Sequence, residues 1–336
     1  MENKIMNYGW LSFIKRNCWR VLLLFSSTLA AIDLEDRVQD FVLETRRISI
    51  PGHPHAFNPS LVFWRGAYLL CFREITAPSL LDSYGPSRIG LVFLDEEFRP
   101  SGEVQILNVL GEDARLVNVD ERLYIVCDGG FRMVVAELNF DGDQFFVEKS
   151  EILTEFPQKS PFKREKNWVP FDYQGNLLLS YTIVPHQILA PDLDGSGRCQ
   201  EVETTSTDHL WRWGEIRGGT PALRCGEEYL SFFHSSIDIA TEHSEGQVMP
   251  HYFMGAYMFQ KDPPFALTRM SEEPIIGKNF YSGENYDPYW HPVRVVFPCG
   301  YVFNEEYIWV VYGRQDHEIW IAKLDKLTLI QKLKAL

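Results

Sequence analysis

The sequence predicts an all-β protein, a five-bladed β-propeller with a short N-terminal extension. Five times along the chain a short polar opener, usually ending in proline, leads into an apolar strand, a turn and a second apolar strand. The equivalent points of the five copies are Pro59, Ala114, Pro170, Pro221 and Pro298. They recur about every fifty residues, with one longer gap before the last, which is typical of propeller blades.

Each copy is a hairpin pattern that predicts the inner strands of one blade. The five hairpins are expected at 57–73, 112–127, 166–181, 219–234 and 296–312. Further apolar runs that predict additional strands lie at 88–93, 133–138, 252–259 and 318–324. The polar stretches 185–215 and 237–250 are expected to be loops, and 262–294 a mixed connection. Residues 33–50 are expected to form a short helix or arm before the first blade.

Composition limits both the architecture and the partners. The chain has 336 residues, of which 45% are hydrophobic, and this is enough to build one large all-β domain over residues 32–336. The formal net charge of −14 argues against nucleic acid and anionic membranes as partners. It leaves neutral ligands such as glycans, or small anions held by a local basic cluster.

Residues 1–31 have the features of a leader segment. Basic residues precede the short apolar run 21–25, and small residues follow up to a cleavage point expected after Ala30. The apolar run is too short for a stable membrane span. These features favour export to the periplasm or the exterior over a cytoplasmic location. The alternative is a cytoplasmic protein with an apolar N-terminal helix.

The six cysteines are widely scattered and include no Cys-x-x-Cys pair, so they suggest neither a zinc site nor a redox pair. Cys71 and Cys127 fall inside apolar strands and are expected to be buried free thiols. Removal of the leader, which contains Cys18, would leave an odd number, which favours a reducing compartment. The thiol count and the leader therefore point in opposite directions.

No metal or cofactor is predicted. Residues 192–197 with Glu203 match a calcium-binding EF-hand loop as a string, but no amphipathic helix flanks them, and Pro185 and Pro191 precede them. A solvated surface loop is the expected structure. Phosphate-binding loops, zinc-protease helices, nucleophile elbows and dinucleotide fingerprints are absent from the sequence.

The second opener, Glu112-Asp113-Ala114-Arg115, is the best catalytic candidate. Glycosyl transfer needs a carboxylic acid that protonates the leaving oxygen, and Asp113 at the head of an inner strand could supply it. Arg115 would hold a neighbouring carboxylate or a substrate group. The same residues could equally form a structural salt bridge at the start of a strand.

The openers and their order resemble those of the family 130 glycoside hydrolases, five-bladed propellers that phosphorolyse or hydrolyse β-mannosides. The similarity extends from about Phe57 to Leu324. It rests on matching pieces in the same order, one or more per blade: Asn58-Pro59 with Arg73, Glu112-Asp113-Ala114-Arg115, Lys166-Asn167-Trp168, Gly218-Gly219-Thr220-Pro221 with His234 and Tyr252, Val296-Phe297-Pro298-Cys299-Gly300, and Tyr312-Gly313-Arg314-Gln315-Asp316.

The resemblance implies a role for each matching residue. Asp113 would be the general acid, acting on the glycosidic oxygen through a sugar hydroxyl. The expected substrate contacts are Asn58, Arg73, Arg115, Lys166 and Asp316. The expected phosphate contacts are His234, Tyr252 and Arg217. Phosphate would attack the anomeric carbon from the opposite face, so the reaction would invert its configuration.

Two departures from the family pattern bear on the activity. Ala114 replaces a proline in the acid motif, but the acid and the arginine remain. The third blade carries no arginine in 181–186, where phosphorylases have one for phosphate, and Lys166, Arg217 or Arg314 would have to compensate. A β-mannosyltransferase with a nucleotide-sugar or sugar-phosphate donor, a non-catalytic glycan-binding propeller and a protein-interaction propeller remain alternatives.

Overall fold

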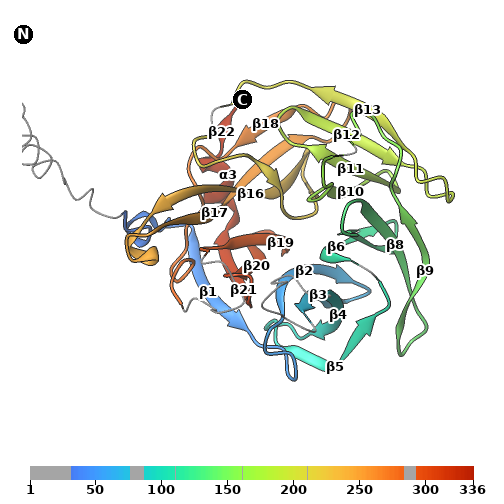
Figure 1. The fold of residues 1–336 in the computed structure, drawn as a ribbon, viewed down its shortest axis with the longest axis horizontal. Helices are drawn as coiled ribbons and strands as arrows, with labels where there is room; N and C mark the ends of the chain where they lie inside the picture. Colours follow the sequence, from blue (N-terminus) through green and yellow to red (C-terminus); the bar gives the residue numbers. More distant parts are fainter. Residues whose placement is uncertain (1–31, 76–86, 110, 161, 210, 284–292) are drawn as a thin grey trace, which may run out of the picture.

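The structure is a computed structural model that describes residues 32–75, 87–109, 111–160, 162–209, 211–283 and 293–336. Its strands form five small antiparallel sheets arranged around a ring (Figure 1), which confirms the predicted five-bladed propeller. The predicted leader 1–31, with Cys18, lies outside the described residues. Within the described residues, no helix is both long and apolar enough to cross a membrane.

The first three blades are four-stranded meanders in which each strand pairs with the next along the chain. Blade one consists of β2 (Phe57–Trp64), β3 (Ala67–Ile75), β4 (Ser87–Leu94) and β5 (Pro100–Leu107). Blade two consists of β6 (Glu112–Val119), β7 (Arg122–Asp128), β8 (Met133–Phe140) and β9 (Phe145–Ile152). Blade three consists of β10 (Val169–Tyr173), β11 (Asn176–Thr182), β12 (His186–Pro191) and β13 (Cys199–Thr205). The predicted inner hairpins of these blades are confirmed.

Blade four is larger and is built around one long hairpin. Its strands are β14 (Arg217–Gly218), β15 (Leu223–Cys225), β16 (Glu228–Ala240), β17 (Val248–Gln260), β18 (Leu267–Met270) and β22 (Lys334–Ala335). The pairing of β16 with β17 continues from Glu228 opposite Gln260 to Ala240 opposite Val248, and the 3-10 helix η2 (Glu242–Ser244) caps its end. The expectation of a loop at 237–250 is therefore wrong, because half-exposed strand residues there carry the ladder beyond the apolar core.

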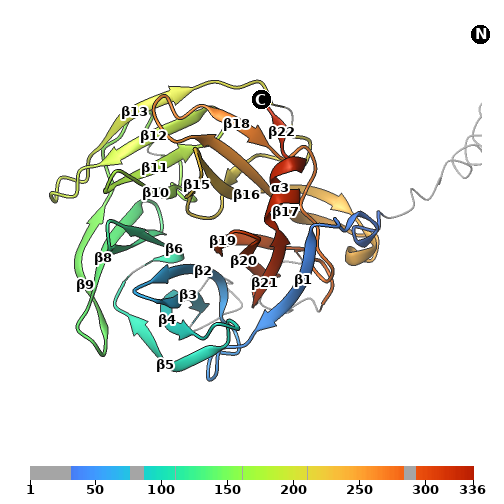
Figure 2. The ribbon, with the colours of Figure 1, turned by 180° about the vertical axis from the view of Figure 1, so that it is seen from behind.

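Blade five closes the ring with a strand from the other end of the chain. Its strands are β19 (Val296–Phe303), β20 (Tyr307–Arg314), β21 (Glu318–Asp325) and, outermost, β1 (Val42–Ile48). The short helix expected in 33–50 is present as η1 (Glu35–Arg37), but the rest of that segment belongs to the last blade instead of preceding the first. Figure 2 shows β1 beside β21, and α3 (Lys326–Lys332) leading from β21 to β22 of blade four.

The segment 185–215 is also more ordered than its sequence predicts. It contains β12 and β13, which are polar or flanked by proline because they form the outer part of blade three. The calcium-like string is the turn between these strands, where Asp194 is exposed and Glu203 lies within β13 opposite Ile188. Among the described residues, no group of three or more His, Cys, Asp or Glu side chains could hold a metal ion.

Apolar contacts between the blades form the core. Gly90 in β4 is required by close packing, since a Cβ atom there would lie 2.2 Å from the ring of Phe72. Cys71 and Cys127 are buried free thiols, as expected, and burial raises the pKa of Cys71 to about 12. These thiols are therefore packing groups and not nucleophiles.

Candidate active site

The openers of the blades converge on one central cavity of about 240 Å³. The sequence-predicted site residues that line it are Asn58, Arg73, Asp113, Lys166, Arg217, His234, Tyr252 and Asp316. The lining also includes Glu112, Asp128, Arg164, Asn167, Val295 and Phe297. The structure thus brings together residues up to 258 positions apart, from Asn58 to Asp316, because every inner strand begins at the same end of the ring.

Left-handed backbone at the openers directs polar side chains into the cavity. Asn58, Asp113, Asn167 and Asp316 have φ angles of 46°, 54°, 64° and 51°. Asn and Asp tolerate this region better than other non-glycine residues, and strained backbone is concentrated at functional sites. The register of the first two blades shifts next to Asn58 and Asp113, as in a β-bulge, which re-aims a side chain.

Asp113 is held by bonds from blade one. Its Oδ1 accepts a hydrogen bond from Asn58 Nδ2 at 2.8 Å and lies 3.2 Å from Arg73 Nη1. Burial alone would raise the pKa of Asp113, but the charge of Arg73 and the bond from Asn58 outweigh it and lower the pKa. The carboxylate therefore has a fixed position and a stabilised negative charge.

A chain of ion pairs extends this cluster toward blade three. Glu112 pairs with both Arg73 and Arg164, and Arg164 Nη2 also lies 2.7 Å from Asp128. Burial raises the pKa of Glu112, although Arg73 and Arg164 oppose that effect. The sequence analysis did not identify Arg164 or Asp128; the basic residues flanking Glu165 just before the third opener were the available signal.

Asp316 has the opposite electrostatic character. Burial and the neighbouring charge of Asp113 raise its pKa to about 6, although Arg73 and Lys166 act in the other direction. The cavity therefore contains two aspartates whose pKa values are pushed apart. Such a pair is typical of an acid–base site.

Basic and aromatic side chains also line the cavity. Lys166 forms no ion pair with any described residue, whereas Arg217 Nη2 lies 2.6 Å from Glu215. The ring of His234 stacks on Tyr252 at 6.0 Å and contacts Phe297 edge-on at 4.5 Å. Burial, Arg115 and Arg217 lower the pKa of His234 well below its usual value, so the ring is neutral near pH 7.

Arg115 is not part of the cavity lining. Its guanidinium is fully buried and donates to the carbonyl oxygens of Asp113, Gly218 and Gly219, and to Asn167 Oδ1 at 3.0 Å. These bonds connect the openers of blades two, three and four beneath the cavity. The structure thus does not bring Arg115 into the position expected for a substrate contact; it supports the backbone that carries the contacts.

Arg314 is likewise turned away from the cavity. It forms a buried ion pair with Glu318, with Nη2 and Oε2 2.5 Å apart, and donates from Nη1 to Asn279 O. Arg314 therefore does not compensate for the arginine missing from the third blade. Of the three residues expected to do so, Lys166 and Arg217 are the two that line the cavity.

The third blade opens a second cavity where the phosphorylase pattern breaks. This cavity measures about 420 Å³ and includes Tyr181, Thr182, Ile183 and Val184 in its lining. It shares Arg164, Lys166, Asn167 and Arg217 with the central cavity. The absence of an arginine from 181–186 thus coincides with open space behind the basic wall.

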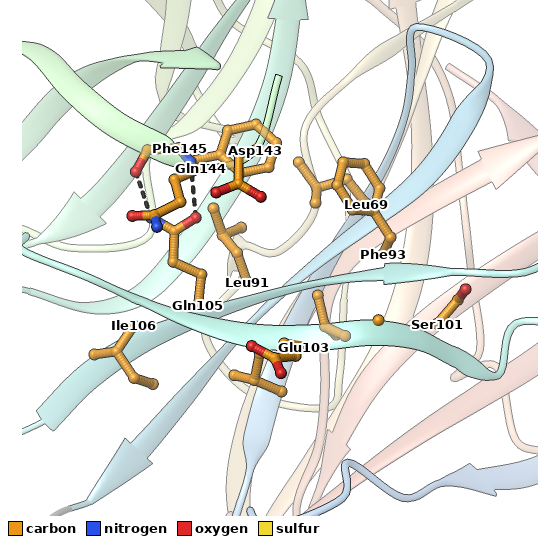
Figure 3. A pocket seen from close by; sticks show the side chains of 13 residues that line it. Leu69, Leu91, Phe93, Ser101, Glu103, Gln105, Ile106, Asp143, Gln144 and Phe145 are labelled. Carbon is orange, nitrogen blue, oxygen red and sulfur yellow. Dashed lines mark hydrogen bonds between the residues drawn. The ribbon is translucent and has the colours of Figure 1, made fainter. Parts of the chain in front are cut away.

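A larger cavity of about 510 Å³ lies away from the openers, between β4, β5 and the β8–β9 turn (Figure 3). Gln105 spans it with two hydrogen bonds to the backbone of Phe145, and Glu103 and Asp143 are its charged residues. None of the predicted site residues lines it. The central cavity, although smaller, is the one that the predicted site residues line.

Known proteins resemble this chain in sequence and in fold. The family model of the β-1,4-mannooligosaccharide phosphorylases, glycoside hydrolase family 130, matches residues 27–334. A search of curated protein sequences finds no match.

Similar solved structures share the fold at low sequence identity. A mannose phosphorylase from Leishmania mexicana, solved with a phosphate ion, is 13% identical with a TM-score of 0.59, covering 90% of this chain and 93% of its own. The β-1,2-mannobiose phosphorylase from Listeria innocua is 15% identical with a TM-score of 0.57, covering 88% and 95%. A GDP-Man-dependent mannosyltransferase from Leishmania mexicana is 13% identical with a TM-score of 0.57, covering 87% and 92%.

The family match spans nearly the whole propeller and includes every opener that forms the central cavity. The chain therefore belongs to glycoside hydrolase family 130, the enzymes that phosphorolyse or hydrolyse β-mannosidic linkages.

Proposed function

We propose that this enzyme phosphorolyses β-mannosides with inversion, releasing α-mannose 1-phosphate. The observation that carries the proposal is that one cavity gathers both carboxylates and cations. We call the two groups of lining residues the carboxylate wall and the basic wall. Asp113 and Asp316 lie on the first, and Lys166, Arg217 and His234 on the second. A sugar between these walls would have a proton donor on one side and an anionic nucleophile on the other.

The chemistry follows from this division. The mannosyl unit is held against Asn58, Arg73 and Asp316. The bond between the anomeric carbon and the leaving oxygen breaks, and that oxygen receives a proton from Asp113. Because Arg73 and Asn58 lower the pKa of Asp113, its carboxylate has to take up a proton from solvent before each turnover. A phosphate oxygen forms the new bond to the anomeric carbon from the opposite face. Because phosphate is itself the nucleophile, no second carboxylate is needed to activate water.

The basic wall supports phosphate over water as the acceptor. Lys166 provides a positive charge that no described carboxylate neutralises within ion-pair distance, and Arg217, which pairs with the exposed Glu215, provides a second cation. Neutral His234 contributes hydrogen bonding without charge, and its Nδ1 has no hydrogen-bond partner among the described residues. Water would need none of these groups, whereas a phosphate ion can use all three.

Incubation with β-1,4- and β-1,2-mannobiose, with and without inorganic phosphate, tests the proposal. We expect α-mannose 1-phosphate to form only when phosphate is present, and ³¹P NMR would detect it. Release of free mannose at the same rate without phosphate would show hydrolysis, with Asp316 then the candidate base. Sugar binding without turnover in any condition would indicate a glycan-binding propeller.

A further inference from the structure

The second cavity, between blades three and four, is large enough for more than an ion. Its volume of about 420 Å³ falls within the roughly 300–1,000 Å³ typical of small-molecule sites. Its wall toward the ring centre consists of Arg164, Lys166, Asn167 and Arg217, which also line the central cavity. A ligand in the second cavity would therefore meet the same cations that face the sugar site.

The charge of the lining differs sharply from that of the chain as a whole. Although the protein carries a net charge of −14, this cavity is lined by four cations, Lys163, Arg164, Lys166 and Arg217, and by one carboxylate, Glu215. Three of the cations have carboxylate partners: Lys163 pairs with Glu165, Arg164 with Glu112 and Asp128, and Arg217 with Glu215. Lys166 forms no ion pair among the described residues, so the lining retains positive charge for an anionic ligand.

The rest of the lining is apolar and aromatic. Ile183 and Ile216 belong to it, as do the rings of Tyr181 and Trp211. Trp211 is fixed by a hydrogen bond from Nε1 to Ser235 Oγ at 2.8 Å and by edge-on packing against Phe233 at 4.9 Å. Such a surface suits a flat, partly apolar group and would be superfluous for inorganic phosphate.

The position of the cavity decides which reactant it can hold. It shares Lys166 and Arg217, the cations that the proposed function assigns to phosphate, with the central cavity. A ligand in it therefore meets the proposed anion site through these two side chains. We propose that the second cavity binds the nucleoside part of a nucleoside diphosphate, whose phosphoryl groups lie along the shared cations. This inference rests on the anion site of the proposed function.

A nucleoside diphosphate fits the same reaction in either direction. In cleavage, its terminal phosphate oxygen forms the bond to the anomeric carbon while the aglycone leaves with a proton. In synthesis, the bond from the anomeric carbon to that oxygen breaks and the diphosphate leaves. The acceptor hydroxyl then attacks from the opposite face and gives its proton to the Asp113 carboxylate, which Arg73 and Asn58 keep ionised.

The test is calorimetric titration of the full chain with inorganic phosphate and separately with ADP, GDP and UDP. We expect at least one diphosphate to bind about tenfold or more tightly than phosphate, and phosphate to compete with it. Val184→Trp, on an exposed position of the lining, should fill the cavity and weaken diphosphate binding about tenfold while leaving phosphate binding within about twofold. Ile216→Trp is the second filling variant, and Val248→Trp, exposed on β17, is the matched control.

Each outcome separates this inference from the proposed function. Phosphate binding with no tighter diphosphate binding overturns the inference and leaves phosphorolysis standing. Diphosphate binding that phosphate does not compete with, or that both filling variants leave unchanged, also overturns it. Failure of both phosphate and diphosphates to bind removes the anion site and the proposed function with it.

Discussion

The two walls of the central cavity are built in opposite ways. On the carboxylate wall, Asp113 is engaged by Asn58 and Arg73, and Glu112 by Arg73 and Arg164. On the basic wall, Lys166 has no ion pair and His234 Nδ1 no hydrogen bond among the described residues. The carboxylates of the first wall are therefore held by internal bonds, although Asn58 Oδ1 has no hydrogen-bond partner among the described residues, whereas Lys166 and His234 Nδ1 of the second wall are available to a ligand.

The largest expected effect is on the preorganised wall. Asp113→Asn keeps the shape of the side chain but removes the proton donor, and general acid catalysis contributes about 10²–10⁴-fold. We expect kcat for β-mannoside phosphorolysis to fall by that factor while mannoside binding, measured by calorimetry, persists. Asp143→Asn, at the cavity of Figure 3, is the matched control. Unchanged turnover in Asp113→Asn would exclude this residue as the acid.

Arg115 joins the two walls, so its replacement tests whether they depend on each other. Arg115→Met leaves carbonyl oxygens of Asp113, Gly218 and Gly219 without their buried donor. Breaking a buried charged network typically costs about 3–5 kcal/mol of unfolding free energy. Arg122→Met, on an exposed side chain of β7, should stay within about 0.5 kcal/mol.

Chemical denaturation of both variants measures the difference. For Arg115→Met, we expect a lower kcat and a higher KM for mannoside, because the openers of blades two to four lose their common support. Normal stability together with a selective rise in the KM for mannoside would instead restore Arg115 as a substrate contact.

The role of Arg115 could not be predicted from the sequence, although the strands around it could. The inner hairpins could be predicted because each is an apolar run, a turn and a second apolar run close together in sequence. The inward-facing openers could be predicted because a propeller directs them to one centre. Whether an opener side chain faces the cavity or the neighbouring blade depends on local register shifts and positive φ angles, and Asp113 and Arg115 differ in this respect.

The outer strands could not be predicted from the sequence for a related reason. β1 is polar, and its partner β21 lies nearly the whole chain away, so no local pattern indicates the pairing. β13 forms the solvent side of blade three, and β12, although largely buried, has only a short apolar run between Gln187 and Pro191. The basic residues flanking Glu165 indicate a site near Arg164, but its partners, Glu112 and Asp128, could not be predicted because they belong to another blade.

Asp316 offers a smaller effect that depends on pH. Its folded-state pKa of about 6 lies above the unfolded value of 3.8, so the folded protein binds the proton more tightly. Its contribution to stability is full below pH 3.8 and is lost as the pH rises through 6. Asp316→Asn, which cannot ionise, should therefore stabilise the protein above pH 6 by on the order of 2 kcal/mol, after allowance for screening in the partly open cavity.

Denaturant titrations at pH 4 and pH 7.5 would measure this difference. The gain should be small at the lower pH and full at the higher one. Equal effects at both pH values would mean that Asp316 titrates normally and that the two aspartates are not coupled. Asp143→Asn again provides the control.

The smallest expected effect falls on the open wall. Lys166→Ala removes a cation that forms no ion pair among the described residues and that acts on Asp316 only at longer range, so the fold loses no ion pair. We expect the KM for phosphate to rise about tenfold, the value of one charge-assisted hydrogen bond, with unfolding free energy almost unchanged. Lys149→Ala, exposed on β9, is the control. The carboxylate wall is held by internal bonds and Lys166 of the basic wall is not, so substitutions on the two walls should have different effects. A variant of the basic wall must lose ligand affinity without stability, and a large loss of stability in Lys166→Ala would mean that this wall, too, is held by internal bonds.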